Sequence, residues 1–327
     1  MRKKISWLVL AGLLIVGCVL SLTLGTLPLT LKDLFNVFSG QSSAVQRLIV
    51  VDFRLPRLLI SILAGMGLAL SGYLFQTITH NDLADPGILG INAGAGFTVL
   101  VYLGFFANNQ ASWMLPLIAC LGSIGAAFLV YYCGRQSEKI VPNRLLLSGV
   151  AVNAGISALT LIGTIRASED SYTFVTSWLA GTIWGTTWQH VFLLLPWLII
   201  IFPILLLRGR TLRVMGLGDE TAIGLGVRLR AAQLFFLLCA LCLAAVSVSV
   251  AGSISFIGLI APHIANNLVG KKSTASLVMA GVVGSLLLLY SDIVGRLILE
   301  SGEIAAGIIV SVIGAPYFVY QLLKNKQ

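Results

Sequence analysis

Long stretches without a single Asp, Glu, Lys or Arg constrain the fold of this chain more than any other feature. A helix needs about 20 mainly apolar residues to cross the hydrocarbon core of a bilayer. Only 10% of the 327 residues are charged, whereas soluble proteins carry about 25%. The chain is therefore predicted to be an all-α, polytopic membrane protein. The uncharged stretches are residues 5–31, 58–79, 86–134, 145–165, 171–207, 231–270, 273–291 and 304–323.

Three of these stretches are too long for one membrane helix. One divides at the polar run Asn108–Gln110, and another divides near Gly252. The third contains a strong span at 188–207, preceded by a Gly/Thr/Trp-rich piece, 171–187, which we predict to be a short or partial helix outside the main span. The total is ten predicted spans in a single transmembrane domain, 1–327.

The first apolar stretch follows Met1-Arg2-Lys3-Lys4, a beginning that a secretory signal peptide would share. The apolar region of a signal peptide is about 7–15 residues long and ends at a small-x-small cleavage site. This stretch is longer than about 20 residues and lacks such a site. We interpret it as a retained helix.

Lys and Arg are divided unequally between the two sets of loops that alternating spans create. Fifteen belong to the set that includes both termini, and six belong to the other set. Because basic residues concentrate in cytoplasmic loops, both termini are predicted to be cytoplasmic. This distribution accounts for most of the net charge of +9, so no nucleic-acid partner is needed to explain it. The six exceptions are Lys32, Arg47, Arg54, Arg57, Arg166 and Arg296.

The sequence lacks the residues that several kinds of chemistry require. No predicted span has an ionisable residue near its middle, which disfavours proton-driven transport and intramembrane catalysis. These absences do not exclude sodium-driven transport, because a sodium site can be built from carbonyls and hydroxyls. The run Gly270–Thr274 lacks the earlier glycine of a phosphate-binding loop. We interpret Cys239 and Cys242 as apolar-span thiols, and we predict no metal, no cofactor and no catalytic residue in the chain.

The longest polar stretch on the predicted cytoplasmic side is Arg208–Arg230. It has about 23 residues, whereas connections between helices in bundles typically have 2–8. We predict one or two short helices here, with Asp219 as an N-cap, Glu220 adding favourable first-turn charge, and Gly224 and Gly226 ending the turn. This segment is either a docking surface for a cytoplasmic partner or an ordinary interhelical loop.

Six motifs follow one another along the chain. They are Arg54-Leu55-Pro56-Arg57, the helix pattern Gly65, Gly67, Ser71, Gly72 and Gln76, and the runs Asn81–Gly90, Leu217–Val227, Gly252–His263 and Gly314–Phe318. In this order they resemble the permease subunits of the iron–siderophore, haem and vitamin B12 ABC importers, the ten-helix type II importer family. Their order and spacing over about 270 residues make the resemblance specific. The chain departs from the family pattern at Asp82, Asn266 and Ala305, which suits a divergent member or one half of a heterodimer.

The resemblance implies a BtuC-like permease fold in the bacterial plasma membrane. It also implies a complex with a second permease subunit, identical or different, two cytoplasmic ABC ATPase subunits that bind ATP–Mg, and an extracytoplasmic substrate-binding protein. The cargo would be an iron compound, either a ferric siderophore or haem, with cobalamin as a further option. Ion-gradient-driven secondary transport of a small solute is the alternative function.

The resemblance further places three arginines, Arg54, Arg57 and Arg296, against the binding protein. Guanidinium groups suit this role because they form bidentate bonds with carboxylates. Anchoring to lipid headgroups is the alternative. Asp292 lies four residues before Arg296 and is expected to steady it through a helical pair.

The remaining expected sites follow from the same resemblance. The span 145–165 is expected to line the pathway and to touch a bulky ligand weakly, without a high-affinity site. The expected ATPase-coupling residues are Leu217, Gly218, Asp219, Glu220, Ala222, Gly224 and Gly226. The expected cytoplasmic gate is Asn81, Leu83, Pro142 and Asn143, and the expected pathway lining is Ser148, Asn153, Ser157 and Thr160.

Overall fold

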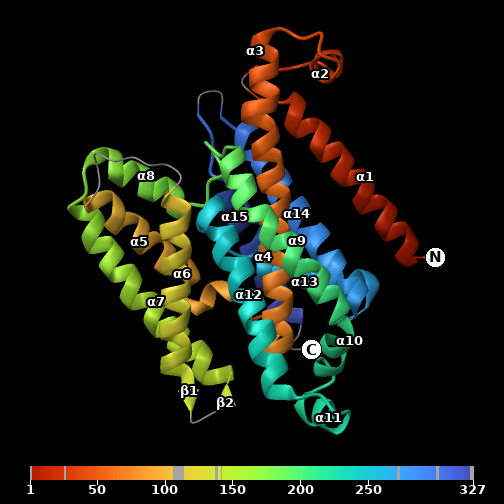
Figure 1. Cartoon of the computed structure of the whole chain (residues 1–327), viewed down its shortest axis with the longest axis vertical. Helices are drawn as coiled ribbons and strands as arrows, with labels where there is room; N and C mark the ends of the chain where they lie inside the picture. The colour runs from red at the N-terminus through yellow and green to blue at the C-terminus, as the bar shows by residue number, and fades with distance from the viewer. Residues whose placement is uncertain are drawn as a thin grey trace.

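The computed structural model describes residues 2–25, 27–105, 114–136, 139–140, 142–270, 273–299 and 302–324. These residues are almost entirely helical (Figure 1). The longer helices are α1 (Arg2–Thr23), α4 (Leu55–Thr79), α5 (Ile91–Phe105), α6 (Met114–Gly134), α7 (Pro142–Ile165), α9 (Trp188–Leu207), α12 (Leu229–Ala251), α13 (Ile257–Val269), α14 (Thr274–Leu297) and α15 (Ala306–Lys324). The shorter elements are α2 (Leu31–Phe38), α3 (Ala44–Arg47), the π-helix η1 (Leu48–Arg54), the 3-10 helix η2 (Pro86–Leu89), α8 (Glu169–Leu179), α10 (Gly209–Met215), α11 (Asp219–Gly224) and the antiparallel strands β1 (Arg135–Gln136) and β2 (Lys139–Ile140).

The ten predicted spans each coincide with a helix. Eight described helices are long and apolar enough to cross a membrane, and α5 and α13 are shorter apolar helices. The predicted partial helix at 171–187 is α8, which begins at Glu169 and ends at Leu179. It begins earlier than predicted because Ser168 caps it, its hydroxyl accepting a hydrogen bond from the Ser171 amide at 3.4 Å.

The second predicted span starts earlier than the sequence indicated. The helix runs without interruption from Ala44 through η1 and α4 to Thr79, whereas the uncharged stretch begins only at residue 58. Pro56 follows the π-helix η1 within this continuous helix, and because proline has no N–H it cannot donate the usual helical hydrogen bond there. The two arginines beside it, Arg54 and Arg57, interrupt the uncharged stretch but not the helix.

Helix α4 runs along the centre of the bundle, between α12, α13 and α14 (Figure 1). Glycines allow this close packing: a Cβ on Gly72 would collide with the backbone of Gly258, and one on Gly65 would collide with Gly284. Polar groups then join the helices, since Gln76 Nε2 donates to the Gly258 carbonyl at 3.3 Å. Small residues that let backbones approach are typical of packed membrane helices.

Helices α5 to α8 form a second group beside this central bundle, seen at the left of Figure 1. Within the group, α5 and α6 pack through Gly94 and Gly122, where a Cβ on either glycine would meet the other's backbone. The Thr98 hydroxyl lies 3.1 Å from the Ile118 carbonyl of α6. Contacts of α6 and α5 with α12 join the group to the central bundle.

The two ends of the bundle differ. Helices α2 and α3 project at one end and α10 and α11 at the other (Figure 1); we call these the α2–α3 end and the α10–α11 end. The α2–α3 arm has a small core of its own made of Leu34, Val37 and Val50. Hydrogen bonds from the Thr30 hydroxyl and amide hold the pKa of Asp33, at the start of α2, below its usual value.

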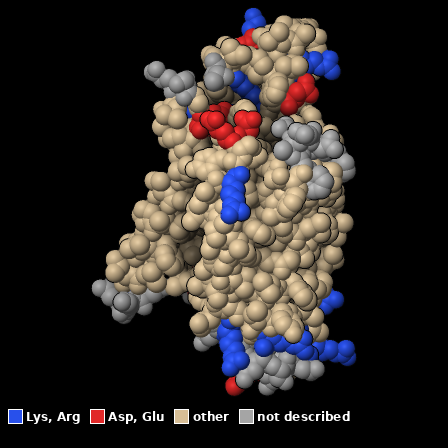
Figure 2. All heavy atoms as spheres, turned by 90° about the vertical axis from the view of Figure 1, so that its left-hand side faces the viewer, with Lys and Arg blue, Asp and Glu red and all other residues tan. Residues whose placement is uncertain are grey.

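Charged side chains gather mostly toward these two ends, and a broad uncharged band lies between them (Figure 2). Many large apolar side chains of the long helices are exposed, such as Phe128 of α6, Leu161 of α7 and Ile199 of α9. An exposed apolar belt of this extent needs a bilayer or another apolar helix against it, because exposing so much apolar surface to water costs free energy.

Candidate functional site: three sites along the bundle

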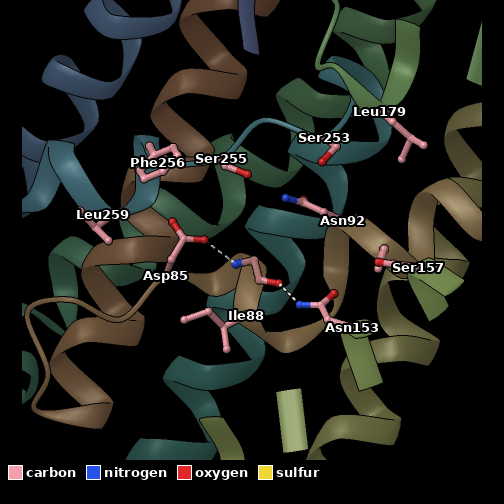
Figure 3. A pocket seen from close by; sticks show the side chains of 12 residues that line it. Asp85, Ile88, Asn92, Asn153, Ser157, Leu179, Ser253, Ser255, Phe256 and Leu259 are labelled. Atoms are coloured by element: carbon pink, nitrogen blue, oxygen red, sulfur yellow. Dashed lines mark hydrogen bonds between the residues drawn. The ribbon is translucent and has the colours of Figure 1, made fainter. Parts of the chain in front are cut away.

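A central cavity of about 440 Å³ opens between the two groups of helices (Figure 3). It lies where the chain leaves helical geometry, in the segments before α5 and before α13. Irregular backbone inside a membrane protein is tolerated where it lines a cavity, because polar groups there can be solvated. The lining residues are Asp85, Gly87, Ile88, Asn92, Ala93, Asn153, Ser157, Leu179, Ser253, Ser255, Phe256 and Leu259.

Two hydrogen bonds fix the wall of this central cavity. Asp85 Oδ1 accepts from the Gly87 amide at 2.7 Å and so caps η2. Asn153 of α7 donates to the Gly87 carbonyl at 3.3 Å, so both sides of one peptide segment are held (Figure 3). Phe256 has a left-handed backbone with φ of 68°, which turns the chain into α13 and brings its side chain to the cavity.

The structure brings only part of the predicted pathway lining to the cavity. Asn153 and Ser157 line it, but Ser148 and Thr160 are not among its lining residues. The Thr160 side chain is buried, and its hydroxyl donates to the Ile156 carbonyl of its own helix at 2.9 Å. The cavity also contains residues that the sequence did not single out one by one, among them Asn92 and Ser255.

A second cavity, of about 390 Å³, lies at the α2–α3 end, and we call it the arginine cavity. The three arginines predicted to contact a binding protein all line it, although they lie on η1, α4 and α14. Its other lining residues are Gly25, Leu27, Ile49, Phe53, Trp184, Gly185, Thr186, Thr187 and Glu303.

Arg57 is the centre of an ion-pair network in the arginine cavity. Its guanidinium lies 2.7 Å from Asp292 Oδ1 and 2.7 Å from Glu303 Oε2. Asp292 is only 2% exposed, whereas Glu303 is 27% exposed. On its other oxygen Asp292 pairs with Arg296 at 2.9 Å, as the four-residue spacing predicted. A buried carboxylate is thus shared between two arginines.

Arg54 and Arg296 direct their hydrogen bonds inward, toward the chain that leaves α1. Arg54 donates to the carbonyls of Leu22, Thr23 and Leu27. Arg296 donates to the Ser21 hydroxyl at 2.8 Å. Both side chains are about 7% exposed, so these arginines already hold the α2–α3 end together. With these bonds formed, Arg54 and Arg296 are as little available to a lipid headgroup as to a binding protein, so both roles stay predictions.

The third site is the segment between α9 and α12 at the α10–α11 end. As predicted, it forms two short helices, α10 and α11, and α11 ends at Gly224. Ala222 is fully buried, while the large apolar residues Leu217, Ile223 and Leu225 are about three-fifths exposed (65%, 59% and 62%). The segment therefore presents an apolar face to its surroundings.

The predicted N-cap of α11 was wrong by one residue. Gly218 is the N-cap, with a φ of 112° that favours glycine, and Asp219 is the first helical residue. The Asp219 carboxylate instead lies 2.9 Å from His80 Nε2. His80 is the left-handed residue that ends α4, so this contact joins α11 to the end of the central helix. No sequence pattern assigned a role to His80, because its partner Asp219 lies 139 residues away in the chain.

Two of the predicted gate residues, Asn81 and Leu83, follow His80 closely in the chain. The Asn81 side chain accepts from the Leu83 amide at 2.9 Å and tightens the turn between α4 and η2. Pro142 and Asn143 are the first residues of α7, but their side chains lie outside the described residues. The structure therefore places half of the predicted gate.

The long apolar helices, the uncharged band and the polar central cavity define a polytopic membrane transport protein. Known proteins identify its class more closely, since the profile of the FecCD transport family matches residues 13–324. The chain belongs to the FecCD transport family. It is thus a permease of ABC transporters, a kind of subunit that lacks an ATPase site because the ATPase is a separate subunit.

Individual relatives agree with this family over nearly the whole chain. The chain is 39% identical to the iron(3+)-hydroxamate import system permease protein FhuG of Bacillus subtilis (strain 168), covering 95% of this chain and 94% of that protein. It is 37% identical to the ferric enterobactin transport system permease protein FepD of Escherichia coli (strain K12), covering 96% and 93%. A metal-chelate type ABC transporter solved in an inward-facing conformation matches with a TM-score of 0.84 and 28% identity, covering 96% and 97%.

Proposed function

We propose that this chain is the permease subunit of a binding-protein-dependent ABC importer that carries a ferric siderophore into the cytoplasm. The observation that carries the proposal is the placement of three sites along one bundle: the arginine cavity at one end, the polar central cavity, and the apolar α10–α11 face at the other end. An importer needs a docking site, a pathway and a coupling site in this order.

The cargo follows from the relatives and from the central cavity. Relatives of this chain are named for import of iron(3+)-hydroxamate, iron(3+)-citrate and ferric enterobactin. The cavity offers amide and hydroxyl groups, with Asp85 as its one acidic side chain among the described lining residues. Such groups suit weak hydrogen bonds to a polar chelate during passage. Haem and cobalamin are the competing cargoes.

The arginine cavity is the proposed docking site for the extracytoplasmic binding protein. Glu303 is the more exposed of the two carboxylates on Arg57, at 27% against 2% for Asp292. An acidic side chain of the binding protein can therefore replace Glu303 on Arg57 without disturbing Asp292. Paired charges at such a rim mainly orient the partner and raise the association rate.

The α10–α11 face is the proposed docking site for the ATPase, and the proposal has this end of the bundle and both termini in the cytoplasm. Two ATPase subunits would hold ATP–Mg, and this chain would hold no cofactor. Movement of α11 reaches α4 through Asp219 and His80. A second permease subunit, identical or different, would cover exposed apolar residues such as Leu147 of α7 and Val312 of α15.

Reconstitution tests the function directly. In proteoliposomes of a bacterial plasma-membrane composition, uptake of a ferric hydroxamate should require the binding protein, the ATPase and ATP. It should survive dissipation of the sodium and proton gradients. Uptake by this chain alone, driven by either gradient, would establish the secondary-transporter alternative, and uptake of haem or cobalamin in place of the siderophore would change the cargo.

The contact between α11 and α4 yields a separate prediction. Replacing His80 with alanine should lower uptake about fivefold or more, because the coupling between two sites is typically 1–3 kcal/mol. ATP hydrolysis and co-purification of the ATPase should persist, since the exposed face of α11 is unchanged. The conservative variant His80→Gln can still hydrogen-bond Asp219 and should restore uptake. Wild-type uptake by His80→Ala would show that force reaches α4 by another route.

A further inference from the structure

A groove at the α10–α11 end borders the third site, with which it shares residues of the segment between α9 and α12, but Leu217, Ile223 and Leu225 are not among its lining residues. It encloses about 590 Å³ between the end of α9, the start of α10 and the first turns of α12. Two arginines, Arg208 and Arg228, lie at its rim, and the described lining residues include no acidic side chain. The other lining residues are Thr211, Gly226, Val227, Ala231, Ala232, Phe235 and Phe236.

The arginines of this groove differ from those of the arginine cavity. Both are exposed, and among the described residues neither forms a salt bridge or a side-chain hydrogen bond with the protein. The guanidinium of Arg208 lies over the ring of Phe235, 5.6 Å from its centroid. This cation–π contact holds the charge at the groove while leaving its N–H donors free.

The walls beside the groove are apolar and exposed. Leu207, at the end of α9, is 83% exposed, and Leu234 and Leu238 of α12 are 44% and 52% exposed. Leu234 and Leu238 are four residues apart and share one face of α12, so apolar surface continues from the arginines along the helix. The groove thus combines two cationic groups at the end of the helices with an exposed apolar surface next to them.

We propose that this groove binds one anionic glycerophospholipid. The phosphate would accept hydrogen bonds from Arg208 and Arg228, with the Thr211 hydroxyl close by, and the acyl chains would lie along α9 and α12. Arginine suits this role because its planar fork presents paired donors to phosphate oxygens. Charge complementarity and the adjoining apolar faces favour a lipid over a soluble anion or an ATPase surface.

The proposed lipid touches the coupling segment. Gly226 and Val227 line the groove and follow Leu225, the C-cap of α11, whose last residue is Gly224. A bound headgroup would therefore fix one end of the segment proposed to contact the ATPase. Which leaflet supplies the lipid depends on the orientation of the chain given under the proposed function. The binding of the lipid does not depend on it.

Lipid titration of the purified full-length chain tests the proposal. Native mass spectrometry in detergent should show phosphatidylglycerol binding at least about tenfold tighter than phosphatidylcholine, because each basic residue near an anionic surface contributes about 1 kcal/mol. The double variant Arg208→Gln/Arg228→Gln should lose this preference. The pair Arg210→Gln/Arg213→Gln removes the same charge from α10 outside the groove and should keep it. Inorganic phosphate at millimolar concentration should not displace the lipid.

Four results would overturn the proposal. They are equal binding of both lipids, retained preference in Arg208→Gln/Arg228→Gln, equal loss in the control pair, and displacement by inorganic phosphate. A fifth result would come from the assembled complex: loss of the ATPase from Arg208→Gln/Arg228→Gln, with the lipid preference intact, would assign the groove to the ATPase interface instead. Because the lipid titration itself needs neither ATPase nor binding protein, its failure is distinguishable from failure of the proposed transport function.

Discussion

Replacing Asp292 with alanine will destabilise the α2–α3 end of the bundle by about 3–5 kcal/mol, the usual cost of breaking a buried ion pair. The carboxylate is 2% exposed and lies within 2.9 Å of both Arg57 and Arg296. Its removal leaves two guanidinium groups close together, and Arg296 is only 7% exposed. The two guanidinium groups then repel each other, and they lose the carboxylate that compensated for their lost hydration. Both effects destabilise the folded chain.

Thermal unfolding of the purified chain in detergent measures this effect, and binding-protein affinity of the reconstituted complex gives a second readout. Asp292→Ala should lower both, because the arginines of the cavity lose their common anchor. Glu303→Gln is the matched control, since it removes the more exposed carboxylate on Arg57. It should unfold within about 1 kcal/mol of wild type and bind the binding protein at least as tightly. An Asp292→Ala chain as stable as wild type would contradict the network.

Replacing Gly72 with valine will prevent α4 and α13 from packing and will cost more than about 3 kcal/mol, the upper range for overpacking a core. A Cβ at this position would overlap the carbonyl oxygen, the carbonyl carbon and the Cα of Gly258. These are backbone atoms of a neighbouring helix, so no side-chain rotation can relieve the collision. The helices must separate, and the hydrogen bonds from Gln76 to the carbonyls of Gly258 and Leu259 in α13 are then lost.

Gly125→Val is the control for this substitution. Gly125 lies in the middle of α6, and a Cβ there has nothing within 4 Å. It should yield folded protein in wild-type amounts, whereas Gly72→Val should yield little monodisperse protein in size-exclusion chromatography. Equal yields of the two variants would show that α13 can move away from α4 at little cost.

The sequence predicted the number and places of the spans well, because the length of an apolar run is a local property that the bilayer thickness tests directly. It failed at the start of α4. There the charges of Arg54 and Arg57 suggested a boundary, but the helix continues from Ala44. The partners that make these charges tolerable, such as Asp292, lie 235 residues away in the chain, beyond any local pattern.

The sites show the same division. Motif resemblance selected Arg54, Arg57 and Arg296, and the structure places all three around one cavity. Helical spacing could not tell that Thr160 hydrogen-bonds its own helix while Asn153 reaches the η2 segment. Nor could it pair His80 with Asp219, which are 139 residues apart.

The sequence alone therefore determined that this chain is a ten-helix membrane permease of its family, because apolar length, charge bias and motif order are written along the chain. Only the tertiary structure decided which polar side chains meet. It turned the arginines inward onto carbonyls and carboxylates, opened the central cavity at two breaks in the helices, and joined α11 to α4. The physical reason is that a charge in a packed bundle takes its partners from whichever helices lie beside it, whatever their distance in sequence.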